Sequence, residues 1–111
     1  LRDVDKALVT NTTLDCTERI LDKYGIRQYF LEIVTSDQVQ YGKPRPDMLI
    51  LACERLGRTA GEVMMIGDTI NDIIAARDAR CTSIGIGVDG DYRIGSLKEL
   101  PSLLKRIMDS T

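Results

Sequence analysis

The residues able to do chemistry in this sequence fall into three short segments. Thr10 and Asn11 follow an apolar run, Lys43 lies in a proline-containing loop, and Asp68 and Asp72 follow a second apolar run. The chain contains no histidine, which removes the commonest general base and the commonest zinc ligand. Any catalysis must therefore rely on carboxylates, lysine, hydroxyl groups or a metal ion held by oxygen atoms.

These residue types suit the handling of a phosphoryl group. Asp68 and Asp72, one helical turn apart, offer two hard oxygen donors of the kind that bind Mg²⁺. Lys43 adds a positive charge, and the Thr10 hydroxyl with nearby backbone N–H groups can hold phosphate oxygens. Taken singly, the aspartates are ordinary helix caps, Lys43 is a solvated loop residue and Thr10-Asn11 is a turn. Together they predict a clamp that stabilises charge during phosphoryl transfer.

The hydrophobic pattern predicts strands and helices in alternation. We expect buried strands over residues 7–9, 33–35, 62–66 and 82–88. We expect helices over 12–24, 47–56, 69–79 and 96–108, and a Gly/Asp-rich loop over 89–95. Such alternation is typical of an α/β protein with a parallel sheet and right-handed crossovers. Open sheets of this kind bind ligands beyond the carboxyl ends of their strands, where the candidate residues are expected.

Composition bounds the class of protein. The 111 residues, 43% of them hydrophobic, fit one ordered domain over residues 1–111. The net charge of -2 and the lack of a basic run argue against nucleic acid as a partner, and no apolar stretch is long enough for a membrane helix. Cys16, Cys53 and Cys81 are widely spaced and odd in number, which favours free thiols in a reducing cytoplasm.

Taken together, the three segments resemble the haloacid dehalogenase superfamily over nearly the whole chain, in particular its phosphoglycolate phosphatase and β-phosphoglucomutase-like branch. That family's second, third and fourth motifs are similar to ALVTN, GKPRPDM and MMIGDTIND in this sequence. The resemblance implies a three-layer Rossmann-like fold and a Mg²⁺-dependent phosphoaspartyl mechanism acting on a small phosphorylated metabolite. It implies that Asp68 ligates Mg²⁺ and that Asp72 ligates it or orients its water. Thr10 and Asn11 are expected to bind the phosphoryl group, and Lys43 to balance its charge.

The family's first motif, an apolar strand followed by DxDGT that carries the nucleophile, has no counterpart in this sequence. Asp3-Val4-Asp5 has the DxD spacing, but only two residues precede it and Lys6 stands where glycine is expected. We therefore do not expect Asp3 to be the nucleophile. In the family the first strand lies between the strands expected here at residues 7–9 and 62–66. The sheet is thus expected to lack that central strand, and with it any cap domain.

Two functional hypotheses follow from this departure. The first is a phosphatase whose N-terminal part lies outside this chain, so that the chain alone is inactive. The second is a truncated, non-catalytic module that binds Mg²⁺, phosphate or a partner, with self-association through the incomplete sheet. A receiver domain is excluded, because its acidic pair would follow the first strand. Mutase, dehalogenase and phosphonatase activities stay open, as does the substrate. No cap domain fits between Thr10 and Lys43.

Overall fold

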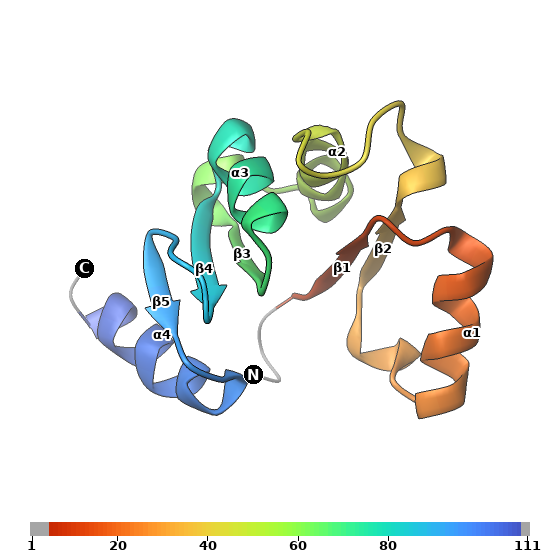
Figure 1. The fold of residues 1–111 in the computed structure, drawn as a ribbon. Helices are drawn as coiled ribbons and strands as arrows, with labels where there is room; N and C mark the ends of the chain where they lie inside the picture. Colours follow the sequence, from red (N-terminus) through yellow and green to blue (C-terminus); the bar gives the residue numbers. More distant parts are fainter. Residues whose placement is uncertain (1–4, 110–111) are drawn as a thin grey trace.

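The predicted alternation of strands and helices is present in the computed structural model, which describes residues 5–109 (Figure 1). The strands are β1 (Ala7–Thr10), β2 (Glu32–Thr35), β3 (Met64–Gly67), β4 (Thr82–Ile86) and β5 (Tyr92–Ile94). The α-helices are α1 (Leu14–Tyr24), α2 (Asp47–Leu56), α3 (Ile70–Ala79) and α4 (Leu100–Asp109). Short 3-10 helices occur at residues 27–29, 36–38, 60–62 and 97–99. Asp3, considered above as a nucleophile, lies outside the described residues.

The strands form two parallel sheets. One contains β1 and β2, and the other has the order β3-β4-β5. Leu8 pairs with Ile33 in the first sheet, and Ile66 pairs with Ile84 in the second. Among the strands of residues 5–109, none joins β1 to β3, and Figure 1 shows these two strands as the neighbouring edges of the two sheets. The expected absence of a central strand is therefore confirmed for the described part of the chain.

One strand was missed by the sequence reasoning. Residues 89–95 were predicted to be a loop, but β5 pairs with β4 in parallel. The segment is short and its pattern is weak, since Tyr92 is exposed and only Ile94 is buried. Ile94 is buried because it packs against β4 and α4. The hydrophobic pattern of residues 89–95 alone does not contain these contacts. Arg93, in the same strand, pairs with Asp89 at 2.8 Å.

Helices pack on both faces of the sheets, as the three-layer prediction requires. A cluster between α2, α3 and the start of β4 contains Leu49, Cys53, Ala75, Ala76, Ala79 and Cys81. A second cluster seats α4 on β4 and β5 through Ile84, Ile94, Leu100 and Leu103. A third seats α2 on β1 and β2 through Val34, Met48 and Ala52. In β3, Met65 packs on the first cluster and Ile66 on the second, which is the alternation of a strand covered on both faces. The α/β fold class is confirmed.

Three helices end at a residue in the left-handed backbone conformation. Gly25 and Gly57 end α1 and α2 at φ values of 64° and 66°. Arg80 ends α3 in the same conformation at φ 66°, where a glycine is the more usual residue. An L-residue with a Cβ pays about 1 kcal/mol or more in this conformation. Within the described residues, no helix is both long and apolar enough to cross a membrane.

Candidate functional site

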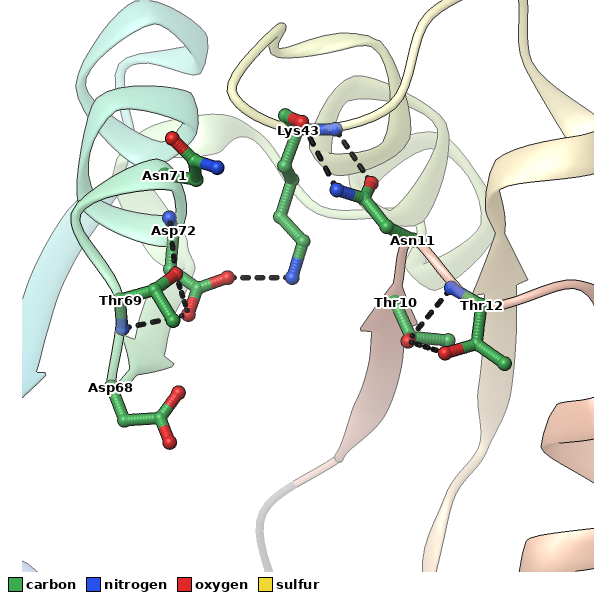
Figure 2. A pocket seen from close by; sticks show the side chains of 8 residues that line it. All are labelled: Thr10, Asn11, Thr12, Lys43, Asp68, Thr69, Asn71 and Asp72. Atoms are coloured by element: carbon green, nitrogen blue, oxygen red, sulfur yellow. Dashed lines mark hydrogen bonds and ion pairs between the residues drawn. The ribbon is translucent and has the colours of Figure 1, made fainter.

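The five residues predicted to form a site all line one cavity. Its volume is about 440 Å³, and it is lined by Thr10, Asn11, Thr12, Lys43, Asp68, Thr69, Asn71 and Asp72 (Figure 2). β1 and β3 both end at this cavity, and the loop before α2 brings Lys43 to it. The structure thus brings together residues from three separate segments at the carboxyl ends of the strands, where parallel sheets bind ligands.

A buried ion pair lies at the centre of the cavity. Lys43 Nζ and Asp72 Oδ1 are 2.5 Å apart, with the two side chains only 11% and 8% exposed. Lys43 Nζ also donates a hydrogen bond to the carbonyl oxygen of Val9 at 3.1 Å. An ammonium group has three N–H donors, so one donor of Lys43 remains for a ligand. The pair also connects the loop before α2 to the first turn of α3.

Both oxygens of the Asp72 carboxylate accept hydrogen bonds. Its Oδ2 accepts hydrogen bonds from the backbone N–H of Thr69 at 3.3 Å and from Thr69 Oγ1 at 3.0 Å. Thr69 Oγ1 in turn accepts from the Asp72 N–H at 3.3 Å, which completes a capping box at the start of α3. Gly67 must be a glycine for this arrangement, because a Cβ there would overlap the Asp72 side chain.

The pKa of Asp72 reflects these contacts. Burial on its own would raise the pKa, but the hydrogen bond and charge of Lys43, with the Thr69 hydrogen bonds, bring it below the ordinary value. Asp72 is therefore ionised at neutral pH and forms a true ion pair with Lys43.

Asp68 differs from Asp72 in its exposure to solvent and in its contacts. It is exposed, and no side chain or N–H group in residues 5–109 bonds to its carboxylate. Figure 2 shows the carboxylate below the Lys43–Asp72 pair, with no dashed line to any labelled residue. Of the two aspartates that line the cavity, Asp68 is exposed and Asp72 is bonded to Lys43.

Asn11 fixes the backbone of Lys43. Its Oδ1 accepts from the Lys43 N–H at 2.8 Å, and its Nδ2 donates to the Lys43 carbonyl at 3.0 Å. Gly42 allows this approach, because a Cβ there would overlap Asn11 Oδ1. Ser36 Oγ donates to the Asn11 carbonyl at 2.7 Å and so holds the backbone of Asn11 in place. The structure thus assigns Asn11 a visible positioning contact, and its predicted contact with phosphate stays a prediction.

Three residues of the cavity were not predicted as site residues, namely Thr12, Thr69 and Asn71. Thr10 Oγ1 donates to Thr12 Oγ1 at 3.1 Å and accepts from the Thr12 N–H at 3.1 Å, so the two hydroxyls lie together. Thr69 had a sequence signal, because the spacing from Thr69 to Asp72 is that of a capping box. Thr12 and Asn71 had none beyond their proximity to predicted residues.

The described residues therefore form a parallel α/β fold with a polar cavity at its strand ends, lined by hydroxyl groups, a lysine and two carboxylates. Residues 1–80 match the family model of the haloacid dehalogenase-like hydrolases, and the chain belongs to that family. The resemblance seen in the sequence is therefore confirmed.

Individual relatives agree with this assignment. The phosphoglycolate phosphatase of Escherichia coli K12 is 38% identical over 85 residues, which cover 77% of this chain and 34% of the relative. A haloacid dehalogenase phosphatase from Thermococcus onnurineus superposes with a TM-score of 0.83 at 30% identity, covering 90% of this chain and 50% of that one. A hydrolase of the same superfamily from Bacillus subtilis, bound to magnesium, has a TM-score of 0.82 at 23% identity, with coverage of 91% and 48%. The chain thus spans about a third of its curated relatives and about half of these solved structures.

Proposed function

We propose that this chain carries the metal-binding and phosphate-binding part of a Mg²⁺-dependent phosphomonoester hydrolase that acts on a small phosphorylated metabolite. The observation that carries the proposal is the division of roles between two carboxylates in one cavity. Asp72 is bound to Lys43 and Thr69, while Asp68 has no partner among the described residues. One carboxylate therefore positions the cation, and the other is available for the metal ion.

The donor set of the cavity fits magnesium. Mg²⁺ prefers oxygen ligands and usually keeps several waters, so one or two protein carboxylates suffice. No group of three His, Cys, Asp or Glu residues capable of holding a metal exists in residues 5–109, which argues against a metal bound wholly by protein side chains. Asp68 would hold the ion directly, and Asn71 also lines the cavity. When bound, Mg²⁺ would neutralise negative charge on the phosphoryl group.

Asp72 acts, in this proposal, through Lys43. Both of its oxygens are already hydrogen-bonded, and direct ligation through Oδ1 would place the metal ion beside the positively charged Lys43 ammonium group. The predicted alternatives were ligation or water orientation. We favour a positioning role, because Asp72 and the Val9 carbonyl fix two of the three Lys43 donors. The third donor then faces a phosphoryl oxygen with a full positive charge.

Thr10 and Thr12 complete the phosphate-binding side. Their hydroxyls lie 3.1 Å apart, and each keeps acceptor or donor capacity after that bond. A phosphoryl oxygen replacing the Thr10–Thr12 hydrogen bond would gain two hydroxyl donors. Asn11 keeps the Lys43 backbone in register with these hydroxyls.

We propose that the nucleophile is not among the residues that line the cavity. The cavity offers Asp68 and Asp72, and both already have other roles in the proposal. By family membership the attacking group is a carboxylate that forms a phosphoaspartyl intermediate. The chain alone is therefore proposed to bind Mg²⁺ and phosphate without turnover. Mutase, dehalogenase and phosphonatase chemistry remain alternatives for the whole protein, and a reducing compartment such as the cytoplasm is proposed for its location.

A chimera tests the proposal. The 85 aligned residues of the Escherichia coli phosphoglycolate phosphatase are replaced by their counterparts from this chain, and hydrolysis of phosphoglycolate is followed with and without Mg²⁺. We expect Mg²⁺-dependent turnover that is abolished by Asp68→Asn and lowered by Thr10→Ala. A folded chimera with normal melting behaviour and no turnover would contradict the proposal.

The chain alone supplies the complementary test. We expect no Mg²⁺-dependent hydrolysis of 4-nitrophenyl phosphate by the purified 111-residue chain. Turnover that Asp3→Ala abolishes would show that the nucleophile lies in this chain after all.

A further inference from the structure

Two cysteines that lie far apart in the sequence meet in the interior. The Sγ atoms of Cys53 and Cys81 are 3.9 Å apart, although 28 positions separate the residues in the chain. Cys53 belongs to α2, and Cys81 lies between α3 and β4. Both are buried, with exposed fractions of 8% and 5%, whereas Cys16 is exposed on α1. All three are free thiols.

The backbone holds both cysteines in place. The Cys53 carbonyl accepts the N–H of Arg58 at 3.0 Å, just after the end of α2. The Cys81 N–H donates to the carbonyl of Ala76 at 2.9 Å, just after the end of α3. Both bonds are the long-range bond of a Schellman motif, which fixes the chain as it leaves a helix. The contact between the two sulfur atoms therefore depends on two anchored backbone segments and on the packing of α2 against α3.

A second cavity has one of the two cysteines in its lining. It has a volume of about 390 Å³ and is lined by Ile73, Arg77, Arg80, Cys81, Thr82, Ser83, Gly90 and Asp91. It shares no residue with the first cavity. Cys81 lines it and Cys53 does not, so Cys81 is the nearer of the two residues for a small reagent that enters this cavity. Arg77, Arg80 and Asp91 also line this cavity, so its lining carries charges of both signs.

We propose that Cys53 and Cys81 are an oxidation site and form an intramolecular disulfide when the protein meets a peroxide. The Cys81 sulfur attacks one oxygen of hydrogen peroxide, an S–O bond forms, the O–O bond breaks, and the departing hydroxide takes up a proton to become water. The Cys53 sulfur then attacks the sulfenic acid sulfur, an S–S bond forms, the S–O bond breaks, and a second water leaves with the remaining thiol proton. The two thiols are oxidised, and the peroxide is reduced to two waters.

The same environment makes the pair slow to react. Burial raises the pKa of Cys81 to about 12, and the adjacent Cys53 adds to this rise. The thiolate, which is the reactive form, is therefore scarce at neutral pH. The pair thus stays reduced under ordinary conditions and reports sustained exposure to oxidant.

The bridge would join elements that also shape the first cavity. Cys53 lies in α2, which follows the Lys43 loop, and Cys81 follows α3, whose first turn carries Asp72. The disulfide would therefore tie α2, which follows the Lys43 loop, to the segment that follows α3. It would also close a loop in the unfolded chain, which raises the free energy of unfolding. We expect the melting temperature of the oxidised chain to rise by about 10 °C.

Peptide mapping of the peroxide-treated 111-residue chain tests the proposal. The protein is incubated with hydrogen peroxide, its remaining thiols are alkylated, and it is digested without reductant. We expect a linked peptide that joins Cys53 to Cys81, an intact mass lower by two hydrogen atoms, and reversal by dithiothreitol. The Cys16→Ala variant should behave like the wild type.

The control variant separates pairing from oxidation in general. Cys53→Ala leaves Cys81 without a partner, so we expect peroxide to add oxygen to Cys81. We do not expect peroxide to raise the melting temperature of this variant, because no disulfide can form between the two positions. If the wild-type chain yields only oxygen adducts, or only dimers joined through Cys16, the proposal is wrong. The wild-type mapping decides the matter even where the variant does not fold.

Discussion

Removing the positive charge of Lys43 should destabilise the fold more than removing both charges of the ion pair. Lys43→Met leaves the Asp72 carboxylate buried, with its side chain 8% exposed, and without a counter-charge. Loss of one partner of a buried pair costs about 3–5 kcal/mol. Asp72 keeps its two hydrogen bonds from Thr69, so we place the loss at the lower end, about 3 kcal/mol.

The double variant isolates the interaction between the two residues. Lys43→Met combined with Asp72→Asn leaves no buried charge and loses mainly the bond to the Val9 carbonyl, at a cost of about 1 kcal/mol. Urea denaturation followed by circular dichroism, in buffer containing EDTA, gives the free energy of unfolding for the wild type, the single variants Lys43→Met and Asp72→Asn, and the double variant. We expect the double variant to be more stable than Lys43→Met alone. Equal or additive losses would refute the existence of a buried, interacting pair.

The pH dependence of the free energy of unfolding in acid also tests the pairing of Asp72 with Lys43. In the wild type the pKa of Asp72 lies below its unfolded value of 3.8, so its contribution to stability is present above that value and is lost as pH falls through the folded pKa. In Lys43→Met, burial is no longer opposed by the lysine, so the pKa of Asp72 should rise. Protonation then removes the stranded charge, and the stability gap between wild type and variant should narrow as the pH falls. A gap that is constant with pH would contradict this assignment.

Three further predictions concern the residues that shape the fold and the site. Arg80→Gly should raise the free energy of unfolding by about 0.5–1 kcal/mol, because it removes the side chain from a residue in the left-handed conformation. Gly57→Ala should lower the free energy of unfolding by about 1 kcal/mol, since only the left-handed backbone conformation opposes the new methyl group. Urea denaturation of both variants measures the cost of a side chain in this conformation, once by removing the side chain and once by adding it. Gly67→Ala should cost about 2 kcal/mol or more and disturb the amide NMR signals of the α3 first turn, through overlap with Asp72; an unchanged spectrum would contradict the close approach. Asn11→Ala should lower the free energy of unfolding by about 1–2 kcal/mol and broaden or shift the Lys43 amide NMR signal. An unaffected Lys43 signal would show that the two hydrogen bonds between Asn11 and the Lys43 backbone are absent in solution.

Much of the architecture was predictable because it rests on strong local signals. Four of the strands and all four helices follow from apolar runs and helix-stop residues such as Gly25 and Gly57. β5 was missed, since the burial of Ile94 depends on β4 and α4 and its own segment is rich in glycine and aspartate. Local pattern cannot supply the packing of elements that are distant in the sequence.

The candidate site divides in the same way. The sequence placed Thr10, Lys43 and Asp68 at one edge of a sheet, because carboxyl ends of parallel strands share an edge. It did not reveal that Asp72 would be bound to Lys43, because that contact requires α3 to pack closely on α2 through the small residues of the cluster between them. The contact between Cys53 and Cys81 depends on the same packing and was likewise invisible in the sequence.

The most direct test of the proposed function is a Mg²⁺ titration of the isotope-labelled chain followed by amide NMR. We predict saturable shifts in residues 67–73 that Asp68→Asn abolishes. Asp15→Asn, which also removes an exposed carboxylate from the start of a helix, should leave the shifts unchanged. An unresponsive 67–73 segment, or shifts that survive Asp68→Asn, would contradict the assignment of Asp68 as the metal ligand.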